Sequence, residues 1–320
     1  MIYWLKMQML IENIRNWLLG NEIVFFHEFV KGPYGGSNTF MNALFEEYKK
    51  NGISVGKNRV SRRTKAVLLN AFLFNVRKLR AYKKHFPGLR IIHRVDGPVG
   101  IYRGDNSGID QELLNLNLEF AGATVFQSNY SYKKNLELGL KFINPSIITN
   151  AVDSRYFYKL EDKYLNKKVK IIATSWSDNP KKGGATYKWI EENLDWNKYE
   201  FTFVGRSQIE FKKIRHIQPV ASEELGNILR DHDIYITASE DDPCSNALIE
   251  ALSCGLPAVF LESGGHPELV NKGGVGFKTK EKSLGAIEEI VLNYDKYQKN
   301  IKVADMKEVG GKYLKILLDQ

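Results

Sequence analysis

The chain has 320 residues, of which 43% are hydrophobic, and this length suits two domains with a core each. Its formal net charge is +9, and it contains no run of 18 apolar residues, which excludes a predicted transmembrane helix. Cys244 and Cys254 are the only cysteines, so the sequence predicts no disulfide framework or cysteine metal site, and we expect a reducing, cytoplasmic location.

The first 50 residues predict a helix, a strand and a second helix. Residues 1–20 carry apolar side chains at helical spacing, and we interpret them as an extra helix docked on the first domain rather than as an interfacial anchor. Residues 23–26 read as a buried strand. A glycine loop with Gly35 and Gly36 follows and leads into a helix over residues 39–50.

The rest of the first 155 residues continues this alternation, and we predict that residues 1–155 form one domain. Strands are predicted over 66–74, 90–95, 124–127 and 146–149, and helices near 111–120 and 130–138.

Positive charge is concentrated in this first domain. Residues 51–100 contain 12 lysines and arginines and one acid, Asp96. Five of the cations lie on one predicted helix: Arg77, Lys78, Arg80, Lys83 and Lys84. This pattern is typical of a solvated charged face, and equally of a patch for anionic membrane lipid or an anionic acceptor. No nucleic-acid-binding motif accompanies it, so we predict no nucleic acid partner.

A second round of strands and helices begins near residue 169 and predicts a second domain over residues 156–300. Predicted strands cover 169–174, 201–205, 233–238 and 258–261, and predicted helices cover 220–229 and 247–254. The strands are continuous apolar runs, which favours parallel sheets covered on both faces. We therefore predict an α/β fold of two Rossmann-like domains facing across a cleft, with residues 301–320 forming a helix that packs back on the first domain.

The most informative segment is residues 239–270. An acidic turn that ends at Asp242 follows a strand and precedes a helix that begins near the capping residues Ser245 and Asn246. Backbone N–H groups and the helix dipole make such a position suitable for phosphate, so we predict that Ser245 and Asn246 bind the donor. Glu250 lies two turns along that helix, so one carboxylate can reach a sugar while the other reaches a ribose.

This segment resembles the donor-binding signature of family-four retaining glycosyltransferases of the GT-B architecture, the glycosyl transferases group 1. Their motif is two glutamates separated by seven residues, a Cys-Gly-x-Pro turn, a strand and Gly-Gly-x-Pro-Glu. Cys254, Gly255 and Pro257 match the turn, and the last part is matched by Gly264, Gly265, Pro267 and Glu268. Asp242 replaces the first glutamate. The resemblance implies that Asp242 contacts the transferred sugar and that Glu250 contacts the ribose hydroxyls.

The resemblance extends to the loops that follow the first strand of each domain. It implies that Gly35 and Gly36 face the donor diphosphate and that Lys182 neutralises it. The family has an arginine five residues before this lysine, and here Ser177 occupies that position. We expect Arg206, which follows the strand over 201–205, to lie at the same sheet edge and to replace the missing arginine.

Acceptor-side candidates follow the third predicted strand of the first domain. Asp96 closes that strand, and we interpret it as a catalytic candidate that touches the donor sugar or orients the acceptor hydroxyl. Arg94, Tyr102 and Arg103 are the candidates for acceptor binding. His93 is interpreted as a core histidine. In the Gly-Gly loop, His266 is a weaker candidate for phosphate contact than Glu268 is for shaping the loop.

No metal site is predicted. The triplet Asp231-His232-Asp233 has the D-x-D form of a metal-dependent glycosyltransferase, but it precedes a strand rather than following one. We therefore expect lysine, backbone amides and a helix terminus to supply the charge for the phosphates, with no cofactor.

The expected reaction is transfer of a hexose from a UDP- or GDP-sugar to a glycan, lipid-linked or protein-linked acceptor, as in polysaccharide biosynthesis. Two alternatives remain open. One is a sugar-nucleotide epimerase on the same architecture. The other is a non-catalytic module that binds a polyanion or a membrane surface, with the departures at Asp242 and Ser177 marking the loss of activity.

Overall fold

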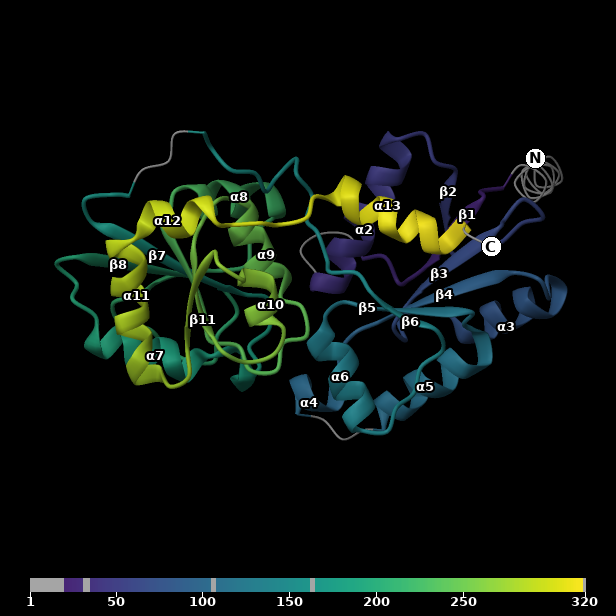
Figure 1. Ribbon diagram of the computed structural model, residues 1–320, viewed down its shortest axis with the longest axis horizontal. Coiled ribbons are helices and arrows are strands. Elements are labelled where there is room, and N and C mark those ends of the chain that lie inside the picture. Colours follow the sequence, from purple (N-terminus) through teal and green to yellow (C-terminus); the bar gives the residue numbers. More distant parts are fainter. Residues whose placement is uncertain (1–19, 31–34, 105–107, 162–164, 319–320) are drawn as a thin grey trace, which may run out of the picture.

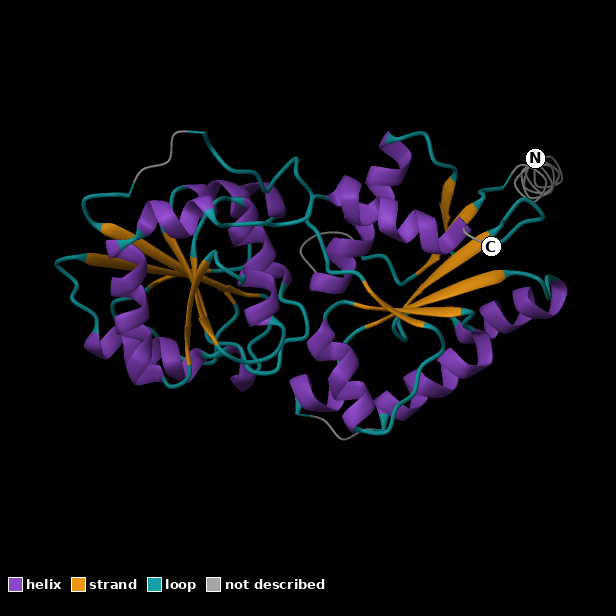
Figure 2. Ribbon diagram, viewed as in Figure 1, coloured by secondary structure: helices purple, strands orange, loops and turns teal. Residues whose placement is uncertain are grey.

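The computed structural model describes residues 20–30, 35–104, 108–161 and 165–318. It contains two six-stranded sheets, both parallel, with helices on both faces of each (Figure 1, Figure 2). The predicted helix over residues 1–20 falls almost entirely outside the described residues. The α/β fold of two Rossmann-like domains is confirmed.

The first sheet has the strand order β2-β1-β3-β4-β5-β6. Its strands are β1 (Ile23–Phe26), β2 (Val55–Lys57), β3 (Ala66–Asn70), β4 (Arg90–Val95), β5 (Ala123–Phe126) and β6 (Pro145–Ile147). The helices that connect them are α2 (Gly36–Lys50), α3 (Val76–His85), α4 (Val99–Arg103), α5 (Ile109–Phe120) and α6 (Asn129–Glu137).

The second sheet has the order β12-β11-β10-β7-β8-β9. Its strands are β7 (Val169–Ser175), β8 (Tyr199–Gly205), β9 (Arg215–Ile217), β10 (Ile234–Thr237), β11 (Ala258–Leu261) and β12 (Gly274–Phe277). The helices are η1 (Pro180–Lys182), α7 (Gly184–Asn193), α8 (Ser222–Arg230), α9 (Asn246–Ser253), α10 (His266–Val270), η2 (Lys280–Lys282), α11 (Ser283–Leu292) and α12 (Tyr294–Lys299).

Each sheet separates two hydrophobic layers, which explains why the central strands are apolar on both faces. In the first sheet Phe25 packs into one layer and Val24 and Phe26 into the other. In the second sheet Ile171 and Ile172 divide in the same way. Alternate residues of a strand point to opposite faces, so continuous apolar runs serve both layers.

The last helix, α13 (Met306–Leu318), packs against α2, β3 and β4 of the first domain (Figure 1). The Tyr48 hydroxyl donates to the carbonyl of Gly310 at 2.9 Å. Arg90 donates to the carbonyl of Ile316 through Nε and Nη2, at 3.0 and 2.8 Å. The bonds from Arg90 satisfy a carbonyl in the last turn of α13, and together with the Tyr48 bond they attach this helix to the first domain.

The structure differs from the sequence prediction in several elements. The strand predicted over 66–74 ends at Asn70, because Ala71 adopts a left-handed backbone conformation (φ 47°) and the chain turns there. Three short strands were not predicted: β2, β9 and β12. Two of them, β2 and β9, have three residues each and lie at sheet edges, where the period-two pattern is too short to detect.

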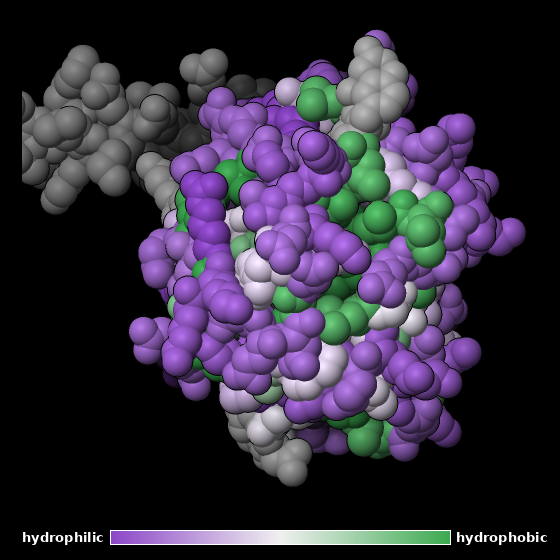
Figure 3. Space-filling view, turned by 90° about the vertical axis from the view of Figure 1, so that its left-hand side faces the viewer, coloured by the Kyte–Doolittle hydropathy of each residue, from purple (hydrophilic) through white to green (hydrophobic). Residues whose placement is uncertain are grey.

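Figure 3 shows the face of the second domain that points away from the first, and hydrophilic side chains cover most of it. Within the described residues, no helix is long and apolar enough to cross a membrane.

Candidate functional site

The carboxyl-terminal ends of the two sheets face each other, and the loops that follow the strands meet between the domains. Gly97, after β4, lies against Pro243, after β10: a Cβ at Gly97 would lie 2.6 Å from the Pro243 Cβ. Gly36, at the start of α2, lies against Asn246 of α9. In open α/β sheets this edge is where ligands bind.

Asp242 and Lys182 form an ion pair in the centre of this region. Lys182 Nζ donates to Asp242 Oδ2 at 2.7 Å, and the Cys244 N–H donates to Asp242 Oδ1 at 3.2 Å. Burial raises the pKa of Asp242, but the Lys182 ammonium and these hydrogen bonds outweigh it and hold the pKa below its usual value. Asp242 is therefore a carboxylate at neutral pH.

Glu250 is in a different environment from Asp242. It lies on α9, is 8% exposed, and burial raises the pKa of its carboxyl to about 8. A protonated carboxyl can both donate and accept a hydrogen bond, which suits a pair of vicinal hydroxyls. Ser245 caps α9 as predicted, since its hydroxyl accepts from the Leu248 N–H at 3.3 Å.

The Asn246 side chain contacts the first domain through both of its polar atoms. Its Nδ2 donates to the carbonyl of Gly36 at 2.6 Å, and its Oδ1 accepts from Asn150 Nδ2 at 2.7 Å. Gly36 permits this approach, because a Cβ there would lie 2.9 Å from Asn246 Nδ2. The side chain predicted to bind the donor thus joins the two domains in this structure.

Arg206 and Lys182 line one cavity of about 240 Å³ at the ends of β7 and β8. Ser177, which replaces the expected arginine, lines the same cavity. Arg206 stacks on the ring of Trp176, with its guanidinium carbon 4.4 Å from the ring centroid. Arg206, the cation expected to compensate for Ser177, therefore lines the same cavity as Ser177.

Asp96 lies at the opposing edge of the first sheet with its carboxylate held by three donors. Ser37 Oγ donates to Oδ2 at 3.1 Å, Arg94 Nη1 donates to Oδ1 at 3.1 Å, and Gln127 Nε2 also donates to Oδ1. The side chain is 15% exposed. The carboxylate is held in place and keeps a small exposed surface.

The predicted acceptor-binding role of Arg94 is wrong. Its side chain is fully buried, with 0% exposure, and its guanidinium packs 4.6 Å from the centroid of the Phe40 ring. A side chain without accessible surface cannot touch an acceptor, so Arg94 acts on the site only through its neighbours.

Tyr102 and Arg103 lie on α4, beside the second domain. Tyr102 packs on Ala71, Val99 and Leu113, and its pKa is raised by burial and by the charge of Asp96. The Arg103 side chain is exposed, and its carbonyl accepts from Asn179 Nδ2 at 3.1 Å. Both residues therefore border the contact between the domains.

Glu268 has a role that the sequence did not indicate. Its carboxylate accepts from the backbone N–H groups of Asn129 and Tyr130, at 2.9 and 2.6 Å, and so caps α6 of the other domain. The Tyr130 hydroxyl donates to Asp241 Oδ1 at 2.9 Å. His266 is buried with its Nδ1 3.1 Å from the carbonyl of Leu261, and the structure gives it no exposed surface for phosphate.

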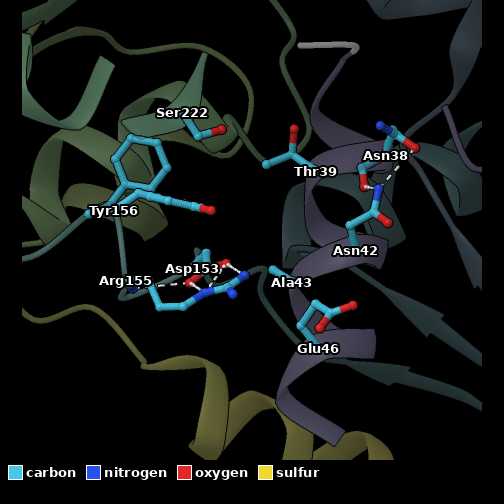
Figure 4. Close-up of a pocket in the computed structure, with 10 residues that line it drawn as sticks. Asn38, Thr39, Asn42, Ala43, Glu46, Asp153, Arg155, Tyr156 and Ser222 are labelled. Atoms are coloured by element: carbon cyan, nitrogen blue, oxygen red, sulfur yellow. Dashed lines mark hydrogen bonds and ion pairs between the residues drawn. The ribbon is translucent and has the colours of Figure 1, made fainter. Parts of the chain in front are cut away.

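A second cavity, of about 200 Å³, lies between α2 and the segment that connects the domains (Figure 4). Thr39 and Ala43 lie on the side of α2 that faces Tyr156 of the connecting segment, and Asn42 and Glu46 also line the cavity. Ser222, the first residue of α8, closes one end. None of the predicted site residues lines this cavity.

Asp231 and Asp233 lie at the opposite edge of the second sheet, at the start of β10. Asp233 is fully buried and accepts from Asn166 Nδ2 and the Lys170 N–H, both at 2.8 Å. Its interpretation as a strand-entry residue is confirmed. Among the residues that the structure describes, no group of three or more His, Cys, Asp or Glu side chains is placed to hold a metal ion.

The family model of glycosyl transferases group 1 matches residues 207–306, which include Asp242 and Glu250. Over these residues the second domain is similar to group 1 glycosyltransferases. Comparison with curated proteins gives no match.

Solved structures of the GT-B fold match nearly the whole chain. Alr3699/HepE of Anabaena in complex with UDP-glucose is 14% identical, with a TM-score of 0.66 over 92% of this chain and 95% of that chain. Sucrose-phosphate synthase from Thermosynechococcus elongatus is 13% identical, with a TM-score of 0.69 over 92% and 94%. The catalytic domain of starch synthase IV from Arabidopsis thaliana, bound to ADP and acarbose, is 11% identical, with a TM-score of 0.68 over 93% and 98%.

Proposed function

We propose that the protein is a retaining glycosyltransferase that moves a hexose from a UDP- or GDP-sugar to a glycan, lipid-linked or protein-linked acceptor without a metal ion. The observation that carries this proposal is the meeting of three separate motifs at one pair of sheet edges. The glycine loop, Lys182 and the Asp242–Glu250 segment are far apart in sequence and lie on loops or helices that follow β1, β7 and β10.

The donor is assigned mainly to the second domain. Lys182 and Arg206 neutralise the diphosphate, together with backbone N–H groups at the start of α9. Glu250 binds the ribose hydroxyls, and Asp242 binds a hydroxyl of the transferred sugar. Solved structures with the same fold contain UDP-glucose or ADP, which agrees with a nucleotide at this edge.

The first domain is assigned to the acceptor, with Asp96 close to the reacting centre and Tyr102 and Arg103 along the approach. In the reaction the bond between the anomeric carbon and the diphosphate oxygen breaks, and a bond to the acceptor oxygen forms on the same face. The acceptor proton passes to the departing diphosphate. Positive charge at Lys182 and Arg206 stabilises that leaving group.

Calorimetry with UDP, GDP, ADP and CMP, with and without magnesium, tests the donor site. We expect one nucleotide to bind at micromolar Kd independently of magnesium, and Glu250→Ala to abolish that binding. Glu288 is an exposed glutamate on α11, so Glu288→Ala is the matched control, and we expect this variant to keep nucleotide binding. If none of the nucleotides binds the wild type, the proposal is wrong, and the non-catalytic alternative takes its place.

Proton NMR of the product tests the stereochemistry, and an inverted anomeric centre would contradict retention. Turnover of the donor sugar to its epimer without any acceptor would instead identify an epimerase.

We also propose that the exposed cations of α3 hold the protein near an anionic membrane surface. Arg77, Lys78 and Lys84 are exposed, while Arg80 is paired with Glu119 at 2.5 Å and Lys83 Nζ donates to the carbonyl of Leu89. Exposed cations on one helix attract anionic headgroups, and salt weakens this attraction by screening the charges.

A further inference from the structure

Six polar side chains form a layer along the carboxyl edge of the first sheet. They stand at or shortly after the ends of β1, β3, β4, β5 and β6, and they are His27, Asn70, Arg94, Asp96, Gln127 and Asn150. All except Asp96 are buried. Hydrogen bonds connect each of them to the next, so the layer is one network rather than six separate groups.

Arg94 determines the orientation of this network because a guanidinium can only donate. Its Nη1 donates to Asn70 Oδ1 at 2.6 Å, and its Nη2 donates to Asn150 Oδ1 at 3.0 Å. Both carboxamide oxygens are therefore turned toward Arg94, and both amide nitrogens point away from it. Asn70 Nδ2 lies 3.1 Å from His27 Nδ1 and donates to it.

Asn150 is the branch point of the network because its amide nitrogen carries two hydrogens. One is donated to Gln127 Oε1 at 2.9 Å, which turns Gln127 Nε2 toward the Asp96 carboxylate. The other is donated to Asn246 Oδ1, in the second domain, at 2.7 Å. Asn150 thus contacts both the group that holds Asp96 and the domain that is assigned to the donor.

The second branch returns to the first domain. Because Asn246 Oδ1 accepts from Asn150, its Nδ2 is free to donate, and it does so to the carbonyl of Gly36 at 2.6 Å. The direction of donation runs from Arg94 through Asn150 and Asn246 to the glycine loop. This last part of the path exists only while the two domains are docked.

We propose that Arg94 and Asn150 are positioning residues that couple docking of the two domains to the placement of Asp96 and of the Gly36 carbonyl. Arg94 sets the orientation of Asn150, and Asn150 connects the contact with Asn246 to the Gln127–Asp96 pair. The catalytic consequence rests on the proposed function, whereas the docking contact itself does not.

Three variants test the coupling: Asn246→Ala, Asn150→Ala and the double variant, with Asn193→Ala as the matched control. Asn193 is exposed on α7 and donates only to the carbonyl of Trp189 in its own helix. The measurements are the Kd of UDP and GDP by calorimetry, the rate of nucleotide release from UDP-glucose and GDP-mannose, and the radius of gyration by small-angle scattering with and without nucleotide.

We expect each single variant to keep its nucleotide Kd within about threefold of wild type and to lower kcat at least about tenfold, because the loss is in positioning and not in donor binding. The radius of gyration of both increases. Since the two residues share one hydrogen bond, the double variant is no slower than the worse single variant. Asn193→Ala matches wild type in every measurement.

Asn150→Asp keeps an acceptor for Arg94 and removes both N–H groups, so it tests the branch point even if Asn150→Ala does not fold. Wild-type kcat in Asn150→Asp would overturn the proposal. So would an Asn246→Ala variant that loses nucleotide affinity tenfold at unchanged kcat, because Asn246 would then be a direct donor ligand. If the wild type neither binds nor turns over nucleotide, the proposed function fails, and an unchanged radius of gyration in Asn246→Ala separately refutes the docking contact.

Discussion

Lys182 Nζ donates a 2.7 Å hydrogen bond to Asp242 Oδ2, so the lysine assigned to the diphosphate and the carboxylate assigned to the sugar are paired with each other. A diphosphate carries more negative charge than one carboxylate and competes for the same ammonium. We therefore expect donor binding to exchange one anionic partner of Lys182 for another and to free Asp242 to accept from a sugar hydroxyl.

Lys182→Ala is expected to weaken UDP or GDP binding about 10- to 100-fold, since a charge-assisted contact to phosphate is lost, equivalent to about 1.4–2.7 kcal/mol. Calorimetry on the wild type and the variant measures this. Lys181→Ala is the matched control, because the neighbouring lysine donates to Asp241 and to the carbonyl of Ile101 instead. Equal losses in both variants would refute a specific phosphate contact by Lys182.

Arg206→Ala is expected to reduce nucleotide affinity about tenfold, and Ser177→Arg in the same background is expected to recover most of it. The reason is that both side chains line the same cavity as Lys182, so an arginine at either position can reach the diphosphate. Titration of the single and double variants with UDP and GDP tests this. An Arg206→Ala variant with wild-type affinity contradicts the compensation.

Glu250→Gln is expected to be more stable than the wild type at high pH in the absence of ligand. Glu250 has a folded pKa of about 8, well above that of an exposed glutamate, so between about pH 4.5 and 8 the folded state binds the additional proton. Stability contributed by Glu250 is therefore lost as pH rises through this window. Urea unfolding at pH 5 and pH 9 should show a variant advantage only at pH 9, on the order of 2–4 kcal/mol. An advantage that is the same at both values would show that Glu250 titrates normally.

Glu268→Ala is expected to loosen the contact between the domains, because the first N–H groups of α6 lose their acceptor across the interface. The free energy of unfolding should fall by an amount typical of a lost helix cap, about 1 kcal/mol, which thermal unfolding measures as a lower melting temperature, and the radius of gyration should increase. Glu262→Ala is the control, since the ion pair of Glu262, with Lys278 at 3.8 Å, lies within the second domain. No difference between the two variants would assign Glu268 a purely local role.

Charge reversal on α3 tests the membrane proposal. The triple variant with Arg77, Lys78 and Lys84 changed to glutamate is expected to lose cosedimentation with vesicles containing phosphatidylglycerol at 0.1 M salt, while its nucleotide Kd is unchanged. The control reverses Lys296, Lys299 and Lys302, which are exposed on and just after α12. If both variants bind vesicles equally, the attraction depends on net charge rather than on α3.

The sequence by itself determined the two parallel sheets and the donor-side motifs. Strands buried on both faces are largely apolar, so β1, β3, β10 and β11 are visible as continuous apolar runs. The cap at Ser245 and the order of Asp242, Glu250 and the Gly-Gly loop depend on local spacing, which a sequence displays directly.

Tertiary structure alone decided what each polar side chain contacts. Arg94 appeared to be an accessible cation, but β4 lies inside the sheet under α2 and α13, so its guanidinium is buried and orients Asn70 and Asn150 instead. Glu268 and Asn246 find their partners in the other domain, more than 90 residues away in sequence. Their roles follow from which two sheet edges face each other, and this is a property of the folded chain that residue spacing does not contain.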